Sequence, residues 1–225
     1  MTAIKVHSVP GSPYGRAVLA ALEEKHAAYR VVAVTPKTLR SPEHLARHPF
    51  GRVPVLEHDD FRLYETQAIL RYLDRALPGP TLTPPEPRPA ARMDQLMNVN
   101  DWYLFQGAGN VITFQRVVAP KVLGLTPDEM AIAGAMPKAH VVFAALAREL
   151  GDGAYFAGDS VSLADLLIAP HLDFFMRTPE WTLLSAQHSN LVAWMERMNG
   201  RPSMRATTWD RVAAMAQGSP ASCAP

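Results

Sequence analysis

The first third of the chain alternates between the period of a strand and the period of a helix. Apolar and polar residues alternate over residues 4–8, apolar positions recur with helical spacing over residues 15–26, and a β-branched run covers residues 29–34. A period of two indicates a half-buried strand, and a period of 3.6 indicates an amphipathic helix. Strand, helix and strand in this order predict a βαβ unit with two parallel strands.

The next segment has the pattern of a hairpin followed by a helix. After a short polar stretch around residues 41–48, the sequence PVLEHDDFRLYE places apolar runs on either side of Asp59 and Asp60. Two turn residues between such runs are typical of a β-hairpin. Apolar residues then recur with helical spacing over residues 66–77. We therefore expect residues 1–77 to form a βαβ-ββα domain around a mixed four-stranded sheet.

The character of the chain changes at a proline-rich segment. Half of the residues in PGPTLTPPEPRP, residues 78–89, are proline, so neither a helix interior nor a central strand runs through it. We interpret it as a linker to an all-α domain over residues 90–216, followed by a disordered tail over residues 217–225. The apolar spacing predicts helices over residues 90–118, 127–150, 162–176, 189–199 and 202–216.

One of these helices has an explicit start signal in GDSVSLADLLIAP. Ser162 is placed to cap the helix, Asp165 to reach back three residues to it, and Val161 and Leu166 to form a hydrophobic staple. This pattern predicts a role in folding, not in chemistry.

Composition and charge narrow the range of functions. The 225 residues carry a formal net charge of +1, and the scattered charges give no footprint for nucleic acid or an anionic membrane. The N-terminus lacks the apolar run of a signal peptide, and no stretch approaches a spanning helix, so we expect a cytoplasmic protein. The single cysteine, Cys223, lies in the tail, which leaves no internal disulfide or redox pair. Any thiol chemistry must use a thiol that the substrate brings.

The βαβ-ββα unit, the proline-rich linker and a helical half that contains SLAD together resemble a cytosolic glutathione transferase. The resemblance covers nearly the whole chain and is strongest to the serine-type classes, above all the phi class and its bacterial relatives, in RSPEHLARHPFGRVPVLEHDDFRLYETQAILRYL. It implies a thioredoxin-like N-terminal domain, a helical-bundle C-terminal domain, and glutathione as co-substrate.

Two dipeptides match the glutathione-binding motifs of this family. The resemblance implies that the bond between Val53 and Pro54 is cis and that the Val53 backbone pairs with the peptide-like middle of glutathione. Glu65 and Thr66 end the hairpin and open the next helix, where free N–H groups and the Thr66 hydroxyl suit a carboxylate. Taken alone, these are also an ordinary strand-start proline and an ordinary helix start.

The basic residues of the resemblance are only partly present. The phi pattern has histidine and then lysine where this chain has Leu39 and Arg40, so Arg40 is left to hold the glycine carboxylate of glutathione. Arg52 stands where the family usually has glutamine, and its cation either attracts the same carboxylate or is simply solvated.

Ser12, in VPGSPYGRAV, matches the serine that activates the thiol in the serine-type classes. A free thiol titrates near 8.5, and a donated hydroxyl hydrogen beside a helix N-terminus favours the thiolate. Ser12 before Pro13 is also a typical helix cap, but a cap uses the oxygen as an acceptor and leaves the hydrogen to donate. Tyr14 and Ser8 are rival hydroxyls.

Other residues are candidates for an interface and for a second pocket. Phe50 occupies the position from which some family members insert an aromatic side chain into a partner subunit, which predicts a homodimer. Candidates for an apolar acceptor pocket are Tyr14, Tyr103, Gln106, Asn110 and Phe114. The histidines, including His44 and His48 four residues apart, do not form a recognisable ligand spacing, so we expect no metal site.

The predicted activity is conjugation of the glutathione thiolate to electrophilic, largely apolar small molecules. A glutathione-dependent isomerase needs the same bound thiolate and stays open as an alternative. So does a non-catalytic ligand carrier or interaction module that kept the fold, because Leu39 and Arg52 depart from the family pattern.

Overall fold

The computed structural model of the protein describes residues 4–217, which fall into two compact units. The sheet unit comprises residues 4–81 and 200–217, and the helical unit comprises residues 82–199. Cys223 and the expected tail after residue 217 lie outside the described residues.

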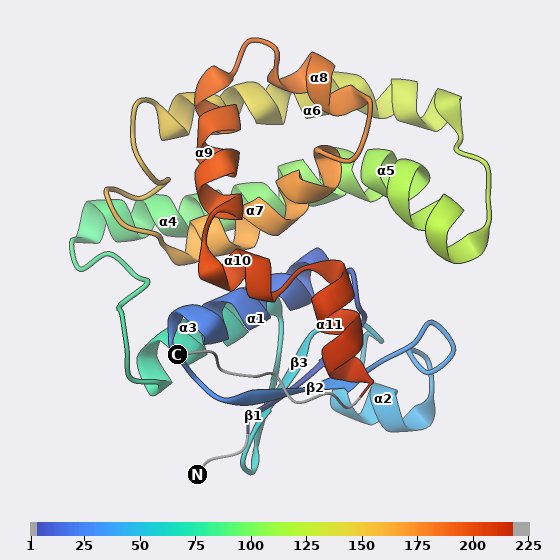
Figure 1. Cartoon of the computed structure of the whole chain (residues 1–225), viewed down its shortest axis with the longest axis vertical. Coiled ribbons are helices and arrows are strands. Elements are labelled where there is room, and N and C mark those ends of the chain that lie inside the picture. The colour runs from blue at the N-terminus through green and yellow to red at the C-terminus, as the bar shows by residue number, and fades with distance from the viewer. Residues whose placement is uncertain (1–3, 218–225) are drawn as a thin grey trace. The chain divides into compact units, whose positions relative to one another are not determined.

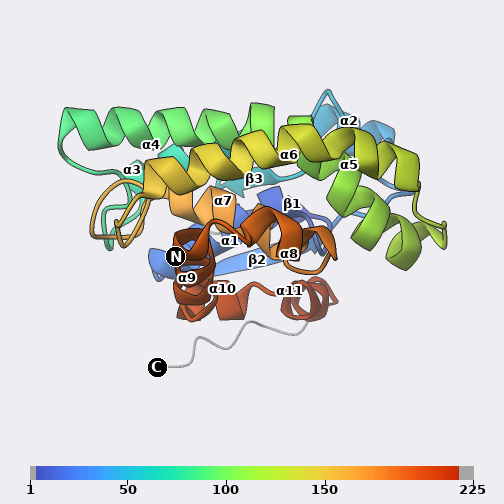
Figure 2. The same ribbon diagram turned by 90° about the horizontal axis from the view of Figure 1, so that it is seen from above.

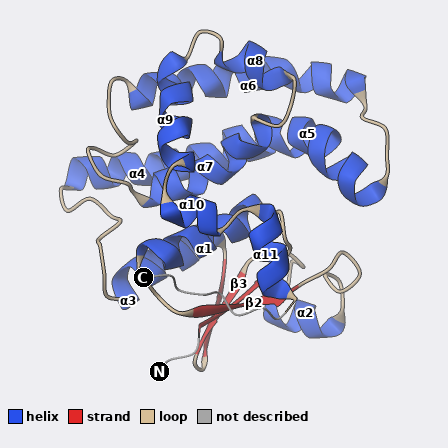
Figure 3. Ribbon diagram, viewed as in Figure 1, coloured by secondary structure: helices blue, strands red, loops and turns tan. Residues whose placement is uncertain are grey.

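The sheet unit has the predicted βαβ-ββα order (Figure 1). Its elements are β1 (Ile4–Ser8), α1 (Pro13–Glu24), β2 (Tyr29–Ala33), α2 (Pro42–Arg47), β3 (Val55–His58), β4 (Phe61–Tyr64) and α3 (Thr66–Ala76). The strands, red in Figure 3, form one sheet in the order β2-β1-β3-β4. β1 is parallel to β2 and antiparallel to β3, and β3 is antiparallel to β4. The mixed four-stranded sheet is therefore confirmed.

The core of the sheet unit follows from the two periodicities. α1 buries a continuous apolar stretch over residues 17–22, and α3 buries Ile69, Leu70 and Leu73 with helical spacing. α1 packs against both α3 and β1. Burial of these aliphatic side chains fixes the first turn of α1 and the first turn of α3 relative to the sheet.

The last part of the chain differs from the predicted helix over residues 202–216. It forms two helices, α10 (Pro202–Ala206) and α11 (Trp209–Ala216), because Thr207 and Thr208 take non-helical conformations between them. The Thr207 hydroxyl donates to the Ser203 carbonyl at 2.8 Å. Both helices belong to the sheet unit, whereas the expected helical domain extended to residue 216.

The helical unit begins with a long rod. α4 (Pro87–Val99) continues through the π-helix η1 (Asn100–Gly109), α5 (Asn110–Thr113) and the π-helix η2 (Phe114–Leu123). It starts inside the expected linker because prolines are tolerated in the first turn of a helix, where the N–H groups have no intrahelical partner. The remaining helices are α6 (Glu129–Leu150), α7 (Leu163–Phe175), α8 (Glu180–Ser185) and α9 (Ser189–Asn199). α8 is not predicted by the sequence pattern.

α6 runs beside the η1 and α5 parts of the rod (Figure 2). By length and composition alone it is also the one helix within the described residues that is long and apolar enough to cross a membrane, with a mean hydropathy of 1.5. One face of α6 is buried, including Ile132, Phe143 and Leu146, and α6 packs against η1, α5, α8 and α9. This is the arrangement of a core helix with one buried face.

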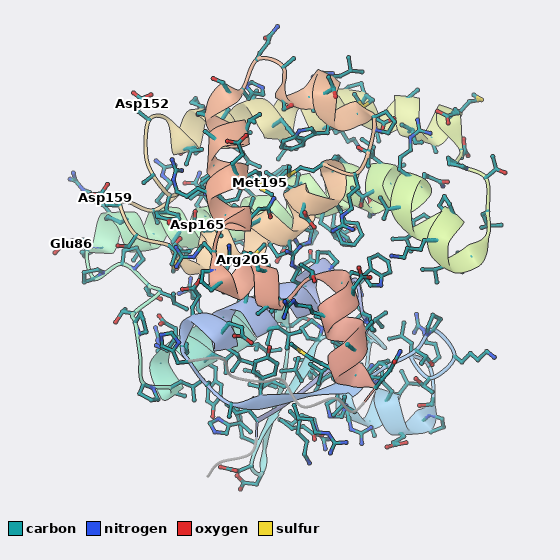
Figure 4. All side chains as sticks on the ribbon, viewed as in Figure 1. Glu86, Asp152, Asp159, Asp165, Met195 and Arg205 are labelled. Carbon is teal, nitrogen blue, oxygen red and sulfur yellow. The ribbon has the colours of Figure 1, made fainter. Side chains whose placement is uncertain are left out.

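The predicted capping box fixes the start of α7. The Asp165 carboxylate is fully buried (Figure 4) and reaches back to the Ser162 N–H at 2.9 Å and the Ser162 hydroxyl at 2.6 Å. Its other oxygen accepts from the Phe156 N–H at 3.0 Å and the Trp194 indole N–H at 2.9 Å. Burial raises the pKa of Asp165, and the four donors act in the opposite direction.

Candidate active site

The register of the sheet brings several chain segments to one end of it. His7 of β1 lies opposite Val55 of β3, and Val55 lies opposite Tyr64 of β4. The turn after β1, the residues before β3 and the residues after β4 therefore leave the sheet at the same end. Because β2 is parallel to β1, the segment after Ala33 begins at this end too. These segments carry the predicted residues Ser12, Arg40, Arg52, Val53, Pro54, Glu65 and Thr66.

Ser12 is the N-cap of α1. Its Oγ accepts a hydrogen bond from the Gly15 N–H at 3.1 Å, and its own N–H donates to the Val9 carbonyl at 2.9 Å. A hydroxyl that accepts through its oxygen still has its hydrogen to donate. The side chain is half-buried, so the geometry combines the cap with a donor near the first turn of α1.

The two rival hydroxyls have different surroundings. Ser8 is only 1% exposed, and its Oγ lies 3.4 Å from the Val9 carbonyl oxygen. The Ser8 hydroxyl also packs so tightly on Gly15 that a Cβ at residue 15 would overlap it. Tyr14, in the first turn of α1, is half-buried like Ser12. Because Ser8 is buried, its hydroxyl is shielded from a thiol that arrives from solution. Ser12 as the activating residue stays a prediction.

The peptide bond between Val53 and Pro54 is cis, as the resemblance predicts. Val53 is half-buried and lies just before β3. The carbonyl of the preceding residue, Arg52, lies 2.9 Å from Nε2 of His44, a buried residue of α2. A histidine of α2 thus anchors the segment whose backbone is expected to meet glutathione.

The start of α3 is open to an acceptor. Glu65, its N-cap, has φ +70° and ψ 113°, a backbone conformation that is rare for residues other than glycine. Within the described residues, the exposed Glu65 side chain makes no capping hydrogen bond, unlike Ser12 on α1 and Ser41 on α2. The first N–H groups of α3 thus lack the acceptor that an N-cap usually supplies, and Thr66 stands among them.

Two exposed arginines lie near Gly51. A Cβ on Gly51, where φ is +58°, would stand 3.3 Å from Nη1 of Arg40 and 3.1 Å from the Leu39 carbonyl oxygen. Arg52 is the next residue and is also exposed. Among the residues described, neither guanidinium forms a salt bridge with a carboxylate. Both cations are therefore available to an anionic ligand.

An aromatic cluster beside Glu65 was not predicted from the sequence. His48 is 2% exposed, and its ring lies 4.6 Å from that of Tyr64 and 6.1 Å from that of Phe50. Burial lowers the pKa of His48, while the nearby Glu65 carboxylate acts to raise it. The spacing of His44 and His48 carries no signal for these roles, because both are set by tertiary contacts.

The helical unit contains an apolar groove of about 480 Å³ between the rod and α6. Tyr103 lines it, whereas Gln106, Asn110 and Phe114 do not. Their assignment to an acceptor pocket stays a prediction. Residues that line the groove include Val99, Tyr103 and Gly107 on the rod and Pro137, Val141 and Ala145 on α6.

In the part of the chain that is described, no cluster of three histidine, cysteine or acidic side chains could hold a metal ion.

Two family profiles match the chain in succession. The profile described as "Glutathione S-transferase, N-terminal domain" matches residues 6–81, and "Glutathione S-transferase, C-terminal domain" matches residues 111–202. Together they cover more than half of the chain.

Curated proteins and solved structures agree with these profiles. "Probable glutathione S-transferase GSTF1" of Oryza sativa subsp. japonica is 32% identical over 91% of this chain and 95% of its own length. Glutathione S-transferase 1 of Zea mays is 33% identical over 82% of this chain and 86% of its own. The structure of glutathione transferase F7 from Populus trichocarpa has a TM-score of 0.82 at 29% identity, covering 95% of this chain and 99% of that one. A glutathione S-transferase-I structure bound with lactoylglutathione has a TM-score of 0.80 at 31% identity, covering 94% and 99%. The chain belongs to the glutathione S-transferase family.

Proposed function

We propose that this protein is a cytoplasmic glutathione transferase of the serine-type, phi-like group. It conjugates the glutathione thiolate to electrophilic, largely apolar small molecules. The observation that carries the proposal is the meeting of Ser12, Val53 and Thr66 at one end of the sheet. The curated relatives are named glutathione S-transferases, and one similar solved structure holds lactoylglutathione.

Each part of glutathione has a chemically suitable partner. The carboxylate of its γ-glutamyl end meets the N-terminal end of α3 and the Thr66 hydroxyl, and its ammonium meets the Glu65 carboxylate. The peptide-like middle pairs with the Val53 backbone. Arg40 and Arg52 supply positive charge for the glycine carboxylate, which makes up for the absence of a basic residue at Leu39.

Ser12 holds the sulfur as the thiolate. Its hydroxyl donates a hydrogen bond to the sulfur, and the nearby first turn of α1 adds the positive end of a helix dipole. A shift of about two units brings the thiol pKa from about 8.5 to about 6.5, so that the thiolate predominates at pH 7. The thiolate then attacks the electrophile, and the protein contributes positioning and electrostatic stabilisation.

The proposal predicts glutathione-dependent conjugation of an activated aryl halide and a specific effect at Thr66. Thr66→Val keeps the shape of the side chain but removes the hydroxyl donor, so we expect glutathione affinity to fall roughly tenfold. Isothermal titration calorimetry with glutathione measures the affinity directly. Thr182→Val, an exposed site on α8, is the matched control and should bind as the wild type does.

The same assays separate the alternatives. Binding without turnover of any electrophile would favour a ligand carrier. Turnover of an isomerisable substrate without net consumption of glutathione would favour an isomerase. Absence of saturable glutathione binding at millimolar concentration would contradict both enzymatic functions and would favour a non-catalytic carrier or interaction module that kept the fold.

We also propose that the protein is a homodimer in which Phe50 of each copy enters the apolar groove of the other. Phe50 is 62% exposed, which is unusual for a large apolar side chain held against two other rings. The groove offers an apolar lining, and the side chains of Tyr103 and Val141 on its rim are themselves largely exposed. An aromatic anchor in a complementary groove is typical of the strongest contacts in protein interfaces.

Phe50→Ser should convert the dimer into a monomer, because it removes a buried aromatic contact twice per dimer. We expect the dissociation constant to rise by about 100-fold or more in analytical ultracentrifugation. Phe61→Ser is the matched control, since Phe61 is an exposed phenylalanine of the same unit at 44% exposure. A Phe50→Ser protein that dimerises as tightly as Phe61→Ser would refute this interface.

A further inference from the structure

The turn that carries Ser12 is covered by an aromatic side chain from near the other end of the chain. At Gly11, φ is +86°, and a Cβ there would lie 2.6–2.7 Å from three ring atoms of Trp209. Glycine is therefore needed at residue 11 both for its backbone conformation and for the close approach of the indole. Trp209 is the first residue of α11 and belongs to the same unit as the turn.

The segment before this indole is fastened to α1. Arg16 donates from Nη2 to the Met204 carbonyl at 3.0 Å. Arg201 pairs with the Glu24 carboxylate at 2.7 Å, and the Ser203 hydroxyl donates to the same carboxylate at 2.5 Å. Burial by itself would raise the pKa of Glu24, but these hydrogen bonds lower it, so the carboxylate stays charged and keeps its partners.

The segment after the indole is fastened to the sheet. α11 packs against β2, and Val212 on this helix is buried. The Tyr29 hydroxyl of β2 lies 3.8 Å from the Met215 sulfur. With both sides held, the indole is a fixed surface against which Gly11 rests.

The turn itself is closed around Gly11. The Ser12 N–H bonds to the Val9 carbonyl on one side, and the Ser12 oxygen accepts from Gly15 on the other. Gly11 is the residue of this loop with the widest choice of backbone angles. A change in its conformation turns the Ser12 side chain, and a hydrogen bond weakens steeply when its angle departs from linearity.

We propose that Trp209 is a positioning residue for the thiol chemistry. By holding Gly11, the indole fixes the direction of the Ser12 hydroxyl, and α11 thereby helps to set the acidity of the bound thiol. The inference rests on the proposed function, because it concerns the thiol of bound glutathione. It gives the C-terminal helices a part in the site that their distance along the sequence does not suggest.

The test is a pH titration of glutathione bound to Trp209→Ala, followed by the ultraviolet absorbance of the thiolate. We expect the pKa of the bound thiol to rise by about one unit and kcat at pH 6.5 to fall roughly fivefold. The dissociation constant of glutathione, measured by calorimetry, should change less than about twofold, because Trp209 is not assigned a contact with the tripeptide. Trp209→Phe keeps an aromatic ring on Gly11, so the pKa of the bound thiol should stay close to that of the wild type.

Two further variants keep the result interpretable. Leu146→Ala is the control for lost stability, because it removes a buried side chain from α6 in the helical unit and leaves α11 intact; it should lower the melting temperature and leave the thiol pKa unchanged. If Trp209→Ala does not fold, Trp209→Leu replaces it and the same titration decides. An unchanged thiol pKa in the Trp209 variant, or an equal shift in Leu146→Ala, would overturn the inference. Failure of the proposed function would look different, since the wild type itself would then bind no glutathione thiolate.

Discussion

Ser12→Ala is expected to lower kcat/KM for conjugation roughly 50-fold at pH 6.5 while glutathione affinity stays nearly unchanged. The variant lacks the hydrogen that stabilises the sulfur anion, so the bound thiol returns toward its ordinary pKa near 8.5. The loss should shrink as the pH is raised, because the thiolate then forms without help. The measurement is a pH profile of kcat/KM from pH 6 to 9, with glutathione binding measured in parallel.

The control variants for this prediction are Ser8→Ala and Tyr14→Phe. Ser8 is buried beneath Gly15, so its removal should leave the pH profile in place. Ser12→Ala also removes the cap of α1, which should lower stability by about 1 kcal/mol without changing the pH profile in this way. Full activity in Ser12→Ala together with a lost profile in Tyr14→Phe would transfer the role to Tyr14.

Asp165→Asn is expected to destabilise the protein by about 4 kcal/mol and lower the melting temperature by about 10 °C. Each carboxylate oxygen of Asp165 accepts from at least one N–H group, of Phe156 and Trp194 on one side and of Ser162 on the other. An amide NH₂ in either position therefore faces a group that can only donate, and both are left unsatisfied in a fully buried site. Thermal and urea unfolding measure the effect.

Asp159→Asn is the matched control, because Asp159 is an exposed carboxylate in the segment before α7 (Figure 4). It should unfold within about 0.5 kcal/mol of the wild type. Equal stability of the two variants would mean that the hydrogen bonds of Asp165 contribute no more than a surface charge.

Much of the fold can be predicted from the sequence because local patterns and packing agree. The alternation of residues 4–8, the turn at Asp59 and Asp60 and the capping box at Ser162 each depend on a few neighbouring residues. α8 and the break at Thr207 are different. α8 is six residues long, too short for a helical period to stand out, and the break in the last helix involves residues that a helix tolerates.

The residues of the candidate site also differ in whether the sequence around them predicts their role. Residues that act through their own turn or helix start, such as Ser12 and Thr66, carry a local signal and a family resemblance. His44 and Trp209 carry no such local signal. Each contacts the backbone of another segment that only the folded structure brings near. Spacing along the chain does not show that an indole needs a glycine at residue 11.

The most direct test of the account is a titration of the wild-type protein with glutathione at several pH values, followed by the absorbance of the thiolate. We predict saturable binding at millimolar concentration or below, with a pKa of the bound thiol about two units lower than the 8.5 of a free thiol. Absence of saturation, or a bound thiol that still titrates near 8.5, would contradict the central claim that this end of the sheet binds glutathione and holds it as the thiolate.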